Sequence, residues 1–186
     1  MKGDFFKELK STASERMKSF NWYSEKINQM KQKGMLSIKN VIDAFEDLPT
    51  SNIEVGSMYM FMYNPKYRKI LPVWDAFPIV IPFSVSNETF TGFNFHYLST
   101  PLRWRMLQVL MNNQDIATRR NLTHYSRIQM DYAVLKNSSH IPILKPTIHS
   151  YRYDHVIPVA KGKYMKVHPS SWKFTVLLPT QDFRSY

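Results

Sequence analysis

The chain contains no cysteine among its 186 residues, which excludes disulfide bonds and thiolate chemistry. Glycine is scarce, at five residues, and neither a phosphate-binding glycine loop nor a dinucleotide fingerprint occurs. No apolar run approaches the roughly 18 residues of a membrane-spanning helix, and the first residues include Asp4 and lack the apolar run of a signal peptide. These absences predict a protein that is made in a cytoplasm and does not enter a membrane.

Residues suited to catalysis or metal binding are few and scattered. The six histidines form no HExxH motif and no pair four positions apart, so the sequence supports no zinc site. The acidic residues after position 49 are Glu54, Asp75, Glu88, Asp115, Asp131, Asp154 and Asp182. Their spacing does not indicate the clustered carboxylates that a metal-dependent nuclease needs. We therefore expect a protein that is not an enzyme and that takes no cofactor, metal or small-molecule substrate.

Positive charge is abundant but unevenly placed. The formal net charge is +11, and residues 101–186 hold 13 Lys and Arg against 4 Asp and Glu, a net charge of +9. Such a one-sided basic field favours a polyanion such as nucleic acid, or an acidic protein surface. The alternative is a basic protein that its charge keeps in solution, and the charge alone does not decide between these interpretations.

Apolar residues recur three and four positions apart over residues 4–33, which is the pattern of one stripe along a long helix. The stripe consists of Phe6, Leu9, Ala13, Met17, Phe20, Tyr23, Ile27 and Met30. Gly34 is expected to end the helix. A stripe of this length needs a partner surface, which is either the rest of this chain or a neighbouring subunit of an assembly.

A second, shorter helix is predicted after Ser37, which can cap it, and Pro49 is expected to end it. Polarity and periodicity both change over residues 49–52, which we interpret as a linker. The sequence therefore predicts a helical arm over residues 1–48 and a compact α+β domain over residues 49–186.

Residues 56–98 hold the apolar centre of the predicted compact domain. Residues 58–63 alternate methionine with tyrosine or phenylalanine, which predicts a strand covered on both faces, and a turn follows at 64–66. Residues 73–77 are flanked by prolines and are predicted to be extended but not central. A short strand over 79–81 is expected to stop at Pro82, and a third strand over 93–97 is expected to place Asn94 and His96 on a wetter face.

Thr100 and Pro101 have the residue types of a helix N-cap and first turn, so a helix is predicted from there to about residue 112. Arg103 and Arg105 are expected on its outer, basic side. Residues 114–140 fit either a strand or a helix, and the pattern leaves that open.

The cations with the best claim to phosphate contacts lie in the second half of the chain. They are Arg103, Arg105, Arg119, Arg120, Arg127, Lys161, Lys163 and Lys166. The alternative is a solvated basic face with no ligand. Asp75 is expected to cap a turn through a backbone hydrogen bond, and His96 is interpreted as a hydrogen-bonded structural histidine rather than a ligand.

A longer pattern runs through residues 56–98. It reads Gly-x-Met-Tyr-x-Phe-x-Tyr-x-Pro-Lys, then Leu-Pro-x-x-Asp-x-Phe-Pro, then Gly-x-Asn-x-His-Tyr-Leu. The residues that form it are Gly56, Met58, Tyr59, Phe61, Tyr63, Pro65, Lys66, Leu71, Pro72, Asp75, Phe77, Pro78, Gly92, Asn94, His96, Tyr97 and Leu98. This pattern resembles the DNA end protector family of T-even-type tailed phages. Weaker matches continue to about residue 182, and the helical arm lies outside the resemblance.

The resemblance implies a non-enzymatic virion protein, made in the host cytoplasm, that binds and protects the ends of linear double-stranded DNA and assists head completion. Phosphate contacts would position it. Trp104 or Tyr125 would stack on the exposed terminal base pair, a hypothesis that rests on residue type and neighbouring charge. Other virion proteins are expected to contact the arm from Phe6 to Met30.

Together these features predict an α+β protein with an N-terminal helical arm, followed by a small bent β-sheet or barrel domain with one or two helices. The alternative function is a structural connector of the phage neck, tail or baseplate, whose arm packs on neighbouring subunits. The charge of residues 101–186 favours DNA, whereas the long apolar stripe favours assembly.

Overall fold

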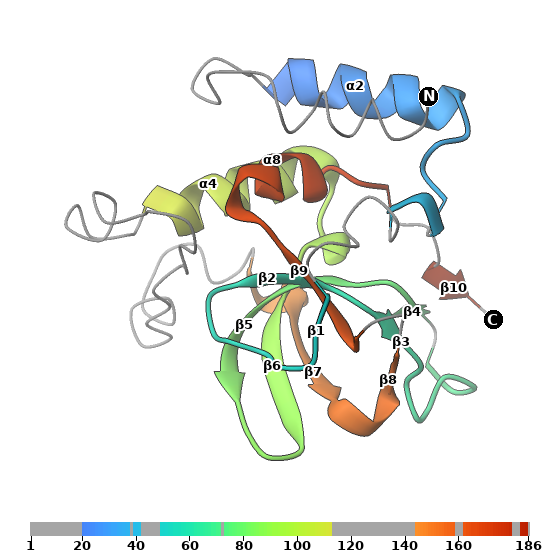
Figure 1. The fold of residues 1–186 in the computed structure, drawn as a ribbon, viewed down its shortest axis with the longest axis vertical. Coiled ribbons are helices and arrows are strands. Elements are labelled where there is room, and N and C mark those ends of the chain that lie inside the picture. Colours follow the sequence, from blue (N-terminus) through green and yellow to red (C-terminus); the bar gives the residue numbers. More distant parts are fainter. Residues whose placement is uncertain are drawn as a thin grey trace.

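The computed structural model describes residues 20–37, 39–41, 49–71, 73–112, 144–158, 162–179 and 183–185. These form an α+β fold in which helices stack over one side of an antiparallel six-stranded sheet (Figure 1). The strand order of that sheet is β1-β9-β2-β5-β6-β7, and two further sheets pair β10 with β4 and β3 with β8. No helix within the described ranges is long and apolar enough to cross a membrane.

The helices are α2 (Phe20–Gln32), α4 (Thr100–Asn112) and α8 (Trp172–Thr175). The strands are β1 (Pro49–Thr50), β2 (Met58–Met60), β3 (Met62–Tyr63), β4 (Val73–Asp75), β5 (Ile79–Val85), β6 (Thr89–Asn94), β7 (Ile148–Arg152), β8 (Val156–Ile157), β9 (Tyr164–Val167) and β10 (Phe183–Ser185). Short 3-10 turns are η2 (Phe95–Tyr97), η3 (Lys145–Thr147), η4 (Tyr153–His155) and η5 (Pro169–Ser171).

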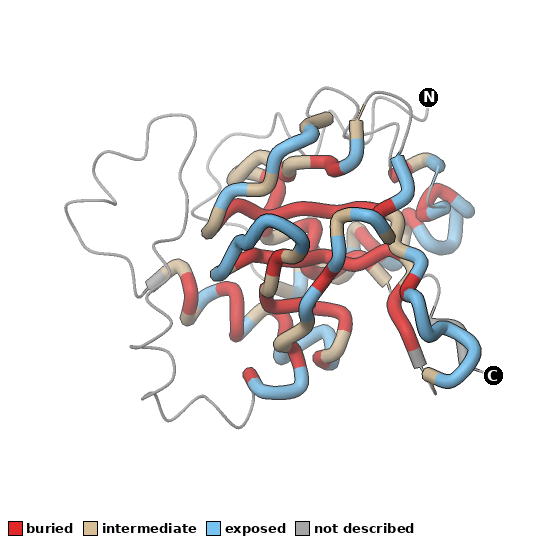
Figure 2. Tube along the Cα trace, turned by 90° about the horizontal axis from the view of Figure 1, so that it is seen from below, coloured by how far each residue is buried: buried red, intermediate tan, exposed pale blue. Residues whose placement is uncertain are grey.

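Strand β2 lies inside the large sheet between β9 and β5 and is buried on both faces. Met58 and Met60 pack on the helical side, whereas Tyr59 and Phe61 pack in a separate cluster on the opposite side. All four side chains are fully buried, and Figure 2 shows buried segments running through the middle of the molecule. The prediction of a strand covered on both faces is therefore confirmed for residues 58–60, whereas Met62 and Tyr63 form the separate strand β3 and are only partly buried.

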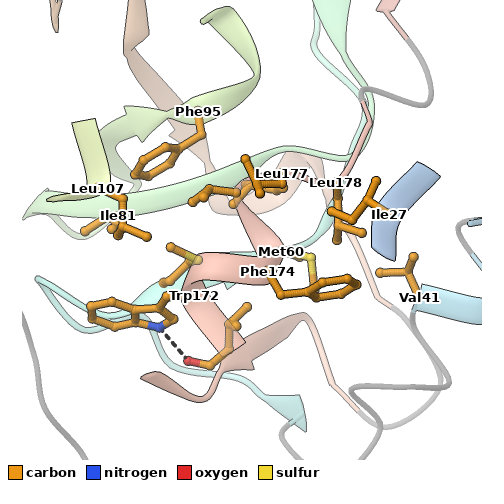
Figure 3. Packing of buried hydrophobic residues seen from close by; sticks show 14 of the residues in the cluster. Ile27, Val41, Met60, Ile81, Phe95, Leu107, Trp172, Phe174, Leu177 and Leu178 are labelled. Carbon is orange, nitrogen blue, oxygen red and sulfur yellow. Dashed lines mark hydrogen bonds between the residues drawn. The ribbon is translucent and has the colours of Figure 1, made fainter. Parts of the chain in front are cut away.

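The larger core lies between the sheet and the helices, and α8 is at its centre. Figure 3 shows Phe174 facing Val41 and Leu178 beside Ile27, so residues near the C-terminus meet residues near the N-terminus. The indole Nε1 of Trp172 donates a hydrogen bond of 2.9 Å to the carbonyl oxygen of Val167, which satisfies the only polar atom of that buried side chain.

The smaller core, on the other face, is mostly aromatic. The ring of Phe61 makes edge-to-face contacts with Phe90, Tyr151 and Tyr164 at centroid distances of 5.5, 5.2 and 5.6 Å. Aromatic pairs in this geometry contribute about 0.5–1.5 kcal/mol beyond the area that they bury. This cluster holds β7 and β9 to β2, although these strands are far apart in the sequence.

Helix α2 packs on its own chain. Tyr23, Ile27 and Met30 belong to the same buried cluster as the helical face of the sheet. Gly34, with a φ of 64°, ends the helix as predicted, and the Met35 N–H then bonds the Met30 carbonyl at 2.9 Å. Of the two partners considered for the apolar stripe, its described part uses the rest of this chain; residues 4–19 lie outside the described residues.

The strand predictions need several corrections. The strand predicted over residues 58–63 is interrupted at Phe61 and forms β2 and β3, which belong to different sheets. Asn94 and His96, predicted to lie on a wetter face, are both buried.

Strand β5 continues through Pro82 to Val85, with a register shift against β6 between Pro82 and Ser84. Its pairing with β2 covers only Ile79 and Val80, so the ladder does not need an N–H from Pro82. Strand β6 ends at Asn94, whose side chain accepts a bond from the His96 N–H and turns the chain into η2. Residues 49 and 50, interpreted as linker, form the edge strand β1 against β9. The domain division at residue 48 stays a prediction.

Gly92 should be far less tolerant of substitution than Gly34. A Cβ at residue 92 would lie 2.7 Å from the Ile81 carbonyl oxygen and 2.9 Å from the Pro82 Cα, so backbone would have to move. We expect Gly92→Ala to lower the free energy of unfolding by about 2–3 kcal/mol. At Gly34 nothing lies within 4 Å of the added atom, so Gly34→Ala should cost only the left-handed backbone strain of about 1 kcal/mol. Urea unfolding measures both, and equal losses would contradict this difference.

Candidate nucleic-acid interface

The structure places the predicted phosphate-contacting residues in different environments. Arg105 on α4 and Lys163 before β9 are exposed. Lys166 on β9 is partly buried, and its ammonium group pairs with the Glu54 carboxylate at 2.6 Å. Four of the predicted cations and one of the two stacking candidates lie outside the described residues: Arg119, Arg120, Arg127, Lys161 and Tyr125.

Arg103 has a structural environment. Only 5 % of it is exposed, so the prediction that it faces solvent is wrong. Its guanidinium donates to the carbonyl oxygens of Leu98 at 2.8 Å and Leu178 at 2.8 Å, and to that of His96 at 3.4 Å. Burial lowers the pKa of this guanidinium to about 10, so it remains charged at neutral pH. A cation with these acceptors ties α4 to the C-terminal segment and is not offered to a phosphate.

Trp104 is half-buried and packs against the N-terminal helix. Its ring centroid lies 5.8 Å from that of Phe20 and 5.7 Å from that of Tyr23. The indole therefore helps to dock α2 on α4. In this arrangement its ring is occupied by neighbours of the same chain instead of being presented to a base pair.

The most connected polar group in the interior is the carboxylate of Asp75, at the end of β4. Oδ1 accepts a bond from the Phe77 N–H at 3.1 Å, which is the turn cap that the sequence predicts. Oδ2 accepts from the Asn94 side-chain amide at 2.8 Å and from His96 Nδ1 at 2.8 Å. Asp75 and His96 are each 5 % exposed. His96 is thus the hydrogen-bonded structural histidine that the sequence predicts.

Asn94 extends this network across the sheet. Its Nδ2 group donates to Asp75 and also to the Tyr151 hydroxyl at 2.9 Å, which uses both amide protons. Burial raises the pKa of Tyr151 well above its ordinary value, so the hydroxyl stays neutral. The network thereby joins β4, β6, β7 and η2 through buried side chains that hydrogen-bond to one another.

The hydrogen-bonded pair of Asp75 and His96 resembles the aspartate and histidine of a hydrolytic triad, but the described residues place no nucleophile beside it. The Nε2 atom of His96 is buried without a hydrogen-bond partner, so no hydroxyl nucleophile adjoins it there. The described residues also contain no group of three or more His, Asp or Glu side chains that could hold a metal ion. In this part of the chain the pair supports the fold and has no partner for catalysis.

Beside this network, Tyr97 and His149 stack at the surface of the sheet. Their ring centroids are 3.9 Å apart at an interplanar angle of 24°, and His149 Nε2 donates to the Pro146 carbonyl oxygen at 3.0 Å. Burial raises the pKa of Tyr97 to about 12, and burial lowers the pKa of His149 from its ordinary value of 6.5. Both rings therefore favour their neutral forms.

Sequence analysis missed one basic surface. The loop between β3 and β4 carries Lys66, Arg68 and Lys69, all exposed, together with the exposed side chains of Tyr67 and Ile70. In the sequence, three cations lie next to or within two positions of Tyr67, and no acidic residue occurs between positions 64 and 71. The segment was interpreted only as a turn, because the charge count placed the basic excess after residue 100.

Comparison with known protein families gives a match over nearly the whole chain. The family model described as the phage T4 terminal DNA protecting protein matches residues 4–186, which include nearly all of the predicted arm that the resemblance in the sequence leaves out. No curated protein and no solved structure matches the chain.

Removal of the Asp75 carboxylate should be strongly destabilising. Asp75→Ala leaves the Phe77 N–H, the Asn94 amide and the His96 ring without their acceptor in a buried site. We expect a loss of about 3–5 kcal/mol in the free energy of unfolding, measured by urea denaturation. Glu88→Ala removes an exposed carboxylate 3.8 Å from Arg152 and serves as the control, with a change below about 0.5 kcal/mol. A similar small change for Asp75→Ala would refute the structural role.

His149 should make stability fall on mild acidification. Because its folded-state pKa is lower than its unfolded value of 6.5, the unfolded chain binds more protons in the interval between the two values. Its contribution is therefore fully present above pH 6.5 and is lost as the pH falls through the folded-state value. NMR titration of the ring, assigned with His149→Gln, should give a pKa below 6.5, and His149→Gln should lose less stability than the wild type between pH 7 and 5. A folded-state pKa at or above 6.5 would contradict the burial argument.

Proposed function

Because the chain belongs to the phage T4 terminal DNA protecting protein family, we propose that it is a virion component that binds the ends of packaged linear double-stranded DNA and shields them from nucleases. The family match over residues 4–186 is the observation that carries this proposal. The net charge of +9 on residues 101–186 supports it, since phosphates are the most abundant charge on a DNA surface.

The proposed mechanism is steric and electrostatic, without catalysis. Exposed cations, among them Arg105 and Lys163, would contact phosphates and set the position of the protein on the duplex. A protein bound at the terminal base pair would then block an exonuclease from binding the end of the duplex. Such a mechanism needs a stable, pre-formed surface, and the buried network around Asp75 provides the rigid body behind it.

We also propose that end binding contributes to completion of the filled head, as the resemblance implies. The alternative, a connector of the neck, tail or baseplate, draws its support from the apolar stripe of the arm. In residues 20–32 that stripe is already covered by the core of the same chain. This part of the arm therefore creates no need for a neighbouring subunit, which makes DNA-end binding the better-supported function.

Competition between two duplexes of equal length tests the function. One is a blunt linear duplex and the other is the same duplex closed at both ends by hairpin loops, so that the two differ in their ends and share nearly all their phosphates. We expect a preference for the linear duplex that persists as salt rises, because raised salt weakens the phosphate contacts common to both. We also expect the bound protein to slow a processive exonuclease on the linear duplex.

Equal binding of the two duplexes, with both affinities lost by physiological salt, would mean that the charge acts only as a general basic field. That outcome would remove end binding and would favour the connector function. The next measurement would then compare how the full chain and a variant without residues 1–19 assemble with other virion proteins.

A further inference from the structure

The loop from Asn64 to Leu71, between β3 and β4, combines features that the rest of the described surface does not bring together. Tyr67 is 57 % exposed and Ile70 is 77 % exposed, and no acidic residue occurs between positions 64 and 71. The loop projects from one end of the molecule, beside β8 (Figure 1). A single exposed apolar side chain is ordinary, whereas two of them three residues apart, among three cations, form a defined amphipathic tip.

The loop is held in place by hydrogen bonds and does not depend on its ligand for its shape. The Arg68 N–H bonds the Pro65 carbonyl at 3.2 Å, and the Ile70 and Leu71 N–H groups bond the Tyr67 carbonyl at 2.9 and 3.0 Å. The Arg68 guanidinium also donates to Asn64 Oδ1 at 3.2 Å. A surface that is already ordered loses little conformational entropy on binding.

The base of the loop is anchored to η4. The Asn64 N–H donates to the His155 carbonyl at 3.0 Å, and His155 Nδ1 donates to the Asn64 carbonyl at 2.9 Å. The neighbouring carboxylate of Asp154 is engaged by Arg152 at 3.0 Å. The acidic group nearest to the anchor is therefore paired with a cation of its own, and the tip retains its positive charge.

One of the three cations of the loop lies close to the exposed ring. The Lys66 ammonium lies 5.5 Å from the centroid of the Tyr67 ring, within the range of a cation–π contact. Among the described residues no carboxylate pairs with Lys66, Arg68 or Lys69. An aromatic ring bordered by unpaired cations matches a flat apolar surface that is bordered by anions.

The end of a DNA duplex is such a surface. The terminal base pair exposes one aromatic face that a neighbouring pair covers everywhere else, and the last phosphates of both strands flank that face. We infer that the Asn64–Leu71 loop contacts the end of the duplex, with Tyr67 and Ile70 against the terminal base pair and Lys66, Arg68 and Lys69 on the flanking phosphates. This inference rests on the proposed function and assigns its contact surface.

The chemistry separates the two kinds of contact. Phosphate contacts strengthen binding to any duplex, whereas stacking adds affinity only where a base face is free. Stacking of one base on an aromatic side chain corresponds to roughly 5- to 150-fold in affinity. Tyr67 should therefore control the preference for ends, and the lysines should control affinity for ends and closed duplexes alike.

The test of stacking uses the full chain with Tyr67→Ala and Tyr67→Phe, the linear and hairpin-closed duplexes described above, and 2-aminopurine at the terminal or an internal position. The wild type and Tyr67→Phe should quench the terminal probe and leave the internal probe unchanged. Tyr67→Ala should lose the quenching and about tenfold of the end preference. Since the side chain is exposed, circular dichroism and the thermal midpoint should be the same for all three proteins.

The test of phosphate contact uses Lys66→Gln/Lys69→Gln and a charge-matched control, Lys31→Gln/Lys39→Gln, which removes two exposed lysines near the C-terminal end of α2. Arg68 is retained because it holds Asn64. The loop variant should lower the slope of log affinity against log salt by about 2, on both duplexes, whereas the control should leave that slope nearly unchanged.

The outcomes separate the inference from the function beneath it. If the wild type prefers the linear duplex and Tyr67→Ala retains that preference and the quenching, the loop is not the contact surface and the function stands. Equal salt slopes for the two lysine variants would likewise remove the phosphate contacts from the loop. If the wild type shows no preference for ends, the function and the inference both fall.

Discussion

The rest of the structure depends on one buried carboxylate. Asp75 is the common acceptor for a backbone N–H, for Asn94 and for His96, and through Asn94 it reaches Tyr151. A buried anion is costly unless it is fully hydrogen-bonded, so this network permits few alternative arrangements of the strands that supply its donors. It fixes the end of β4 and the turn η2 relative to β6 and β7, and Arg103, whose guanidinium also reaches the His96 carbonyl, links the same region to the C-terminal segment.

A sheet with apolar residues on both faces must be packed against other parts of the chain on both sides, and here the two faces are covered by different kinds of structure. Helices α2, α4 and α8 cover one face, whereas a cluster of aromatic rings fills the other. The aromatic cluster draws β8 and the 3-10 turn before it to the same end of the sheet as β3. Because of that packing, the loop between β3 and β4 projects from the molecule on an ordered base. The shape of the basic tip therefore depends on the aromatic core.

The interior and the surface of the protein have different roles in the proposed function. The interior uses a histidine, an aspartate and an arginine for structure, which are residue types that in other settings perform catalysis or bind phosphate. Other described cations, among them Arg105 and Lys163, are exposed, and in the Asn64–Leu71 loop three exposed cations stand with an exposed aromatic ring. A rigid body with a basic, partly aromatic tip suits the proposed contact with a charged duplex that ends in a flat face, and in that proposal occupancy of the end is what protects it.

The sequence by itself determined the features that depend on neighbouring residues. The strand over residues 58–60 that is covered on both faces, the helix start at Thr100 and the stop at Gly34 are all encoded by local periodicity or backbone preference, and the structure has each of them. Tertiary structure alone decided the burial of Arg103, the passage of β5 through Pro82 and the convergence on Asp75. These depend on partners far along the chain, such as Tyr151 for Asn94 at 57 residues and Leu178 for Arg103 at 75. Local pattern carries no information about such partners, because the free energy of burying a polar group is set by whichever donors and acceptors folding brings to it.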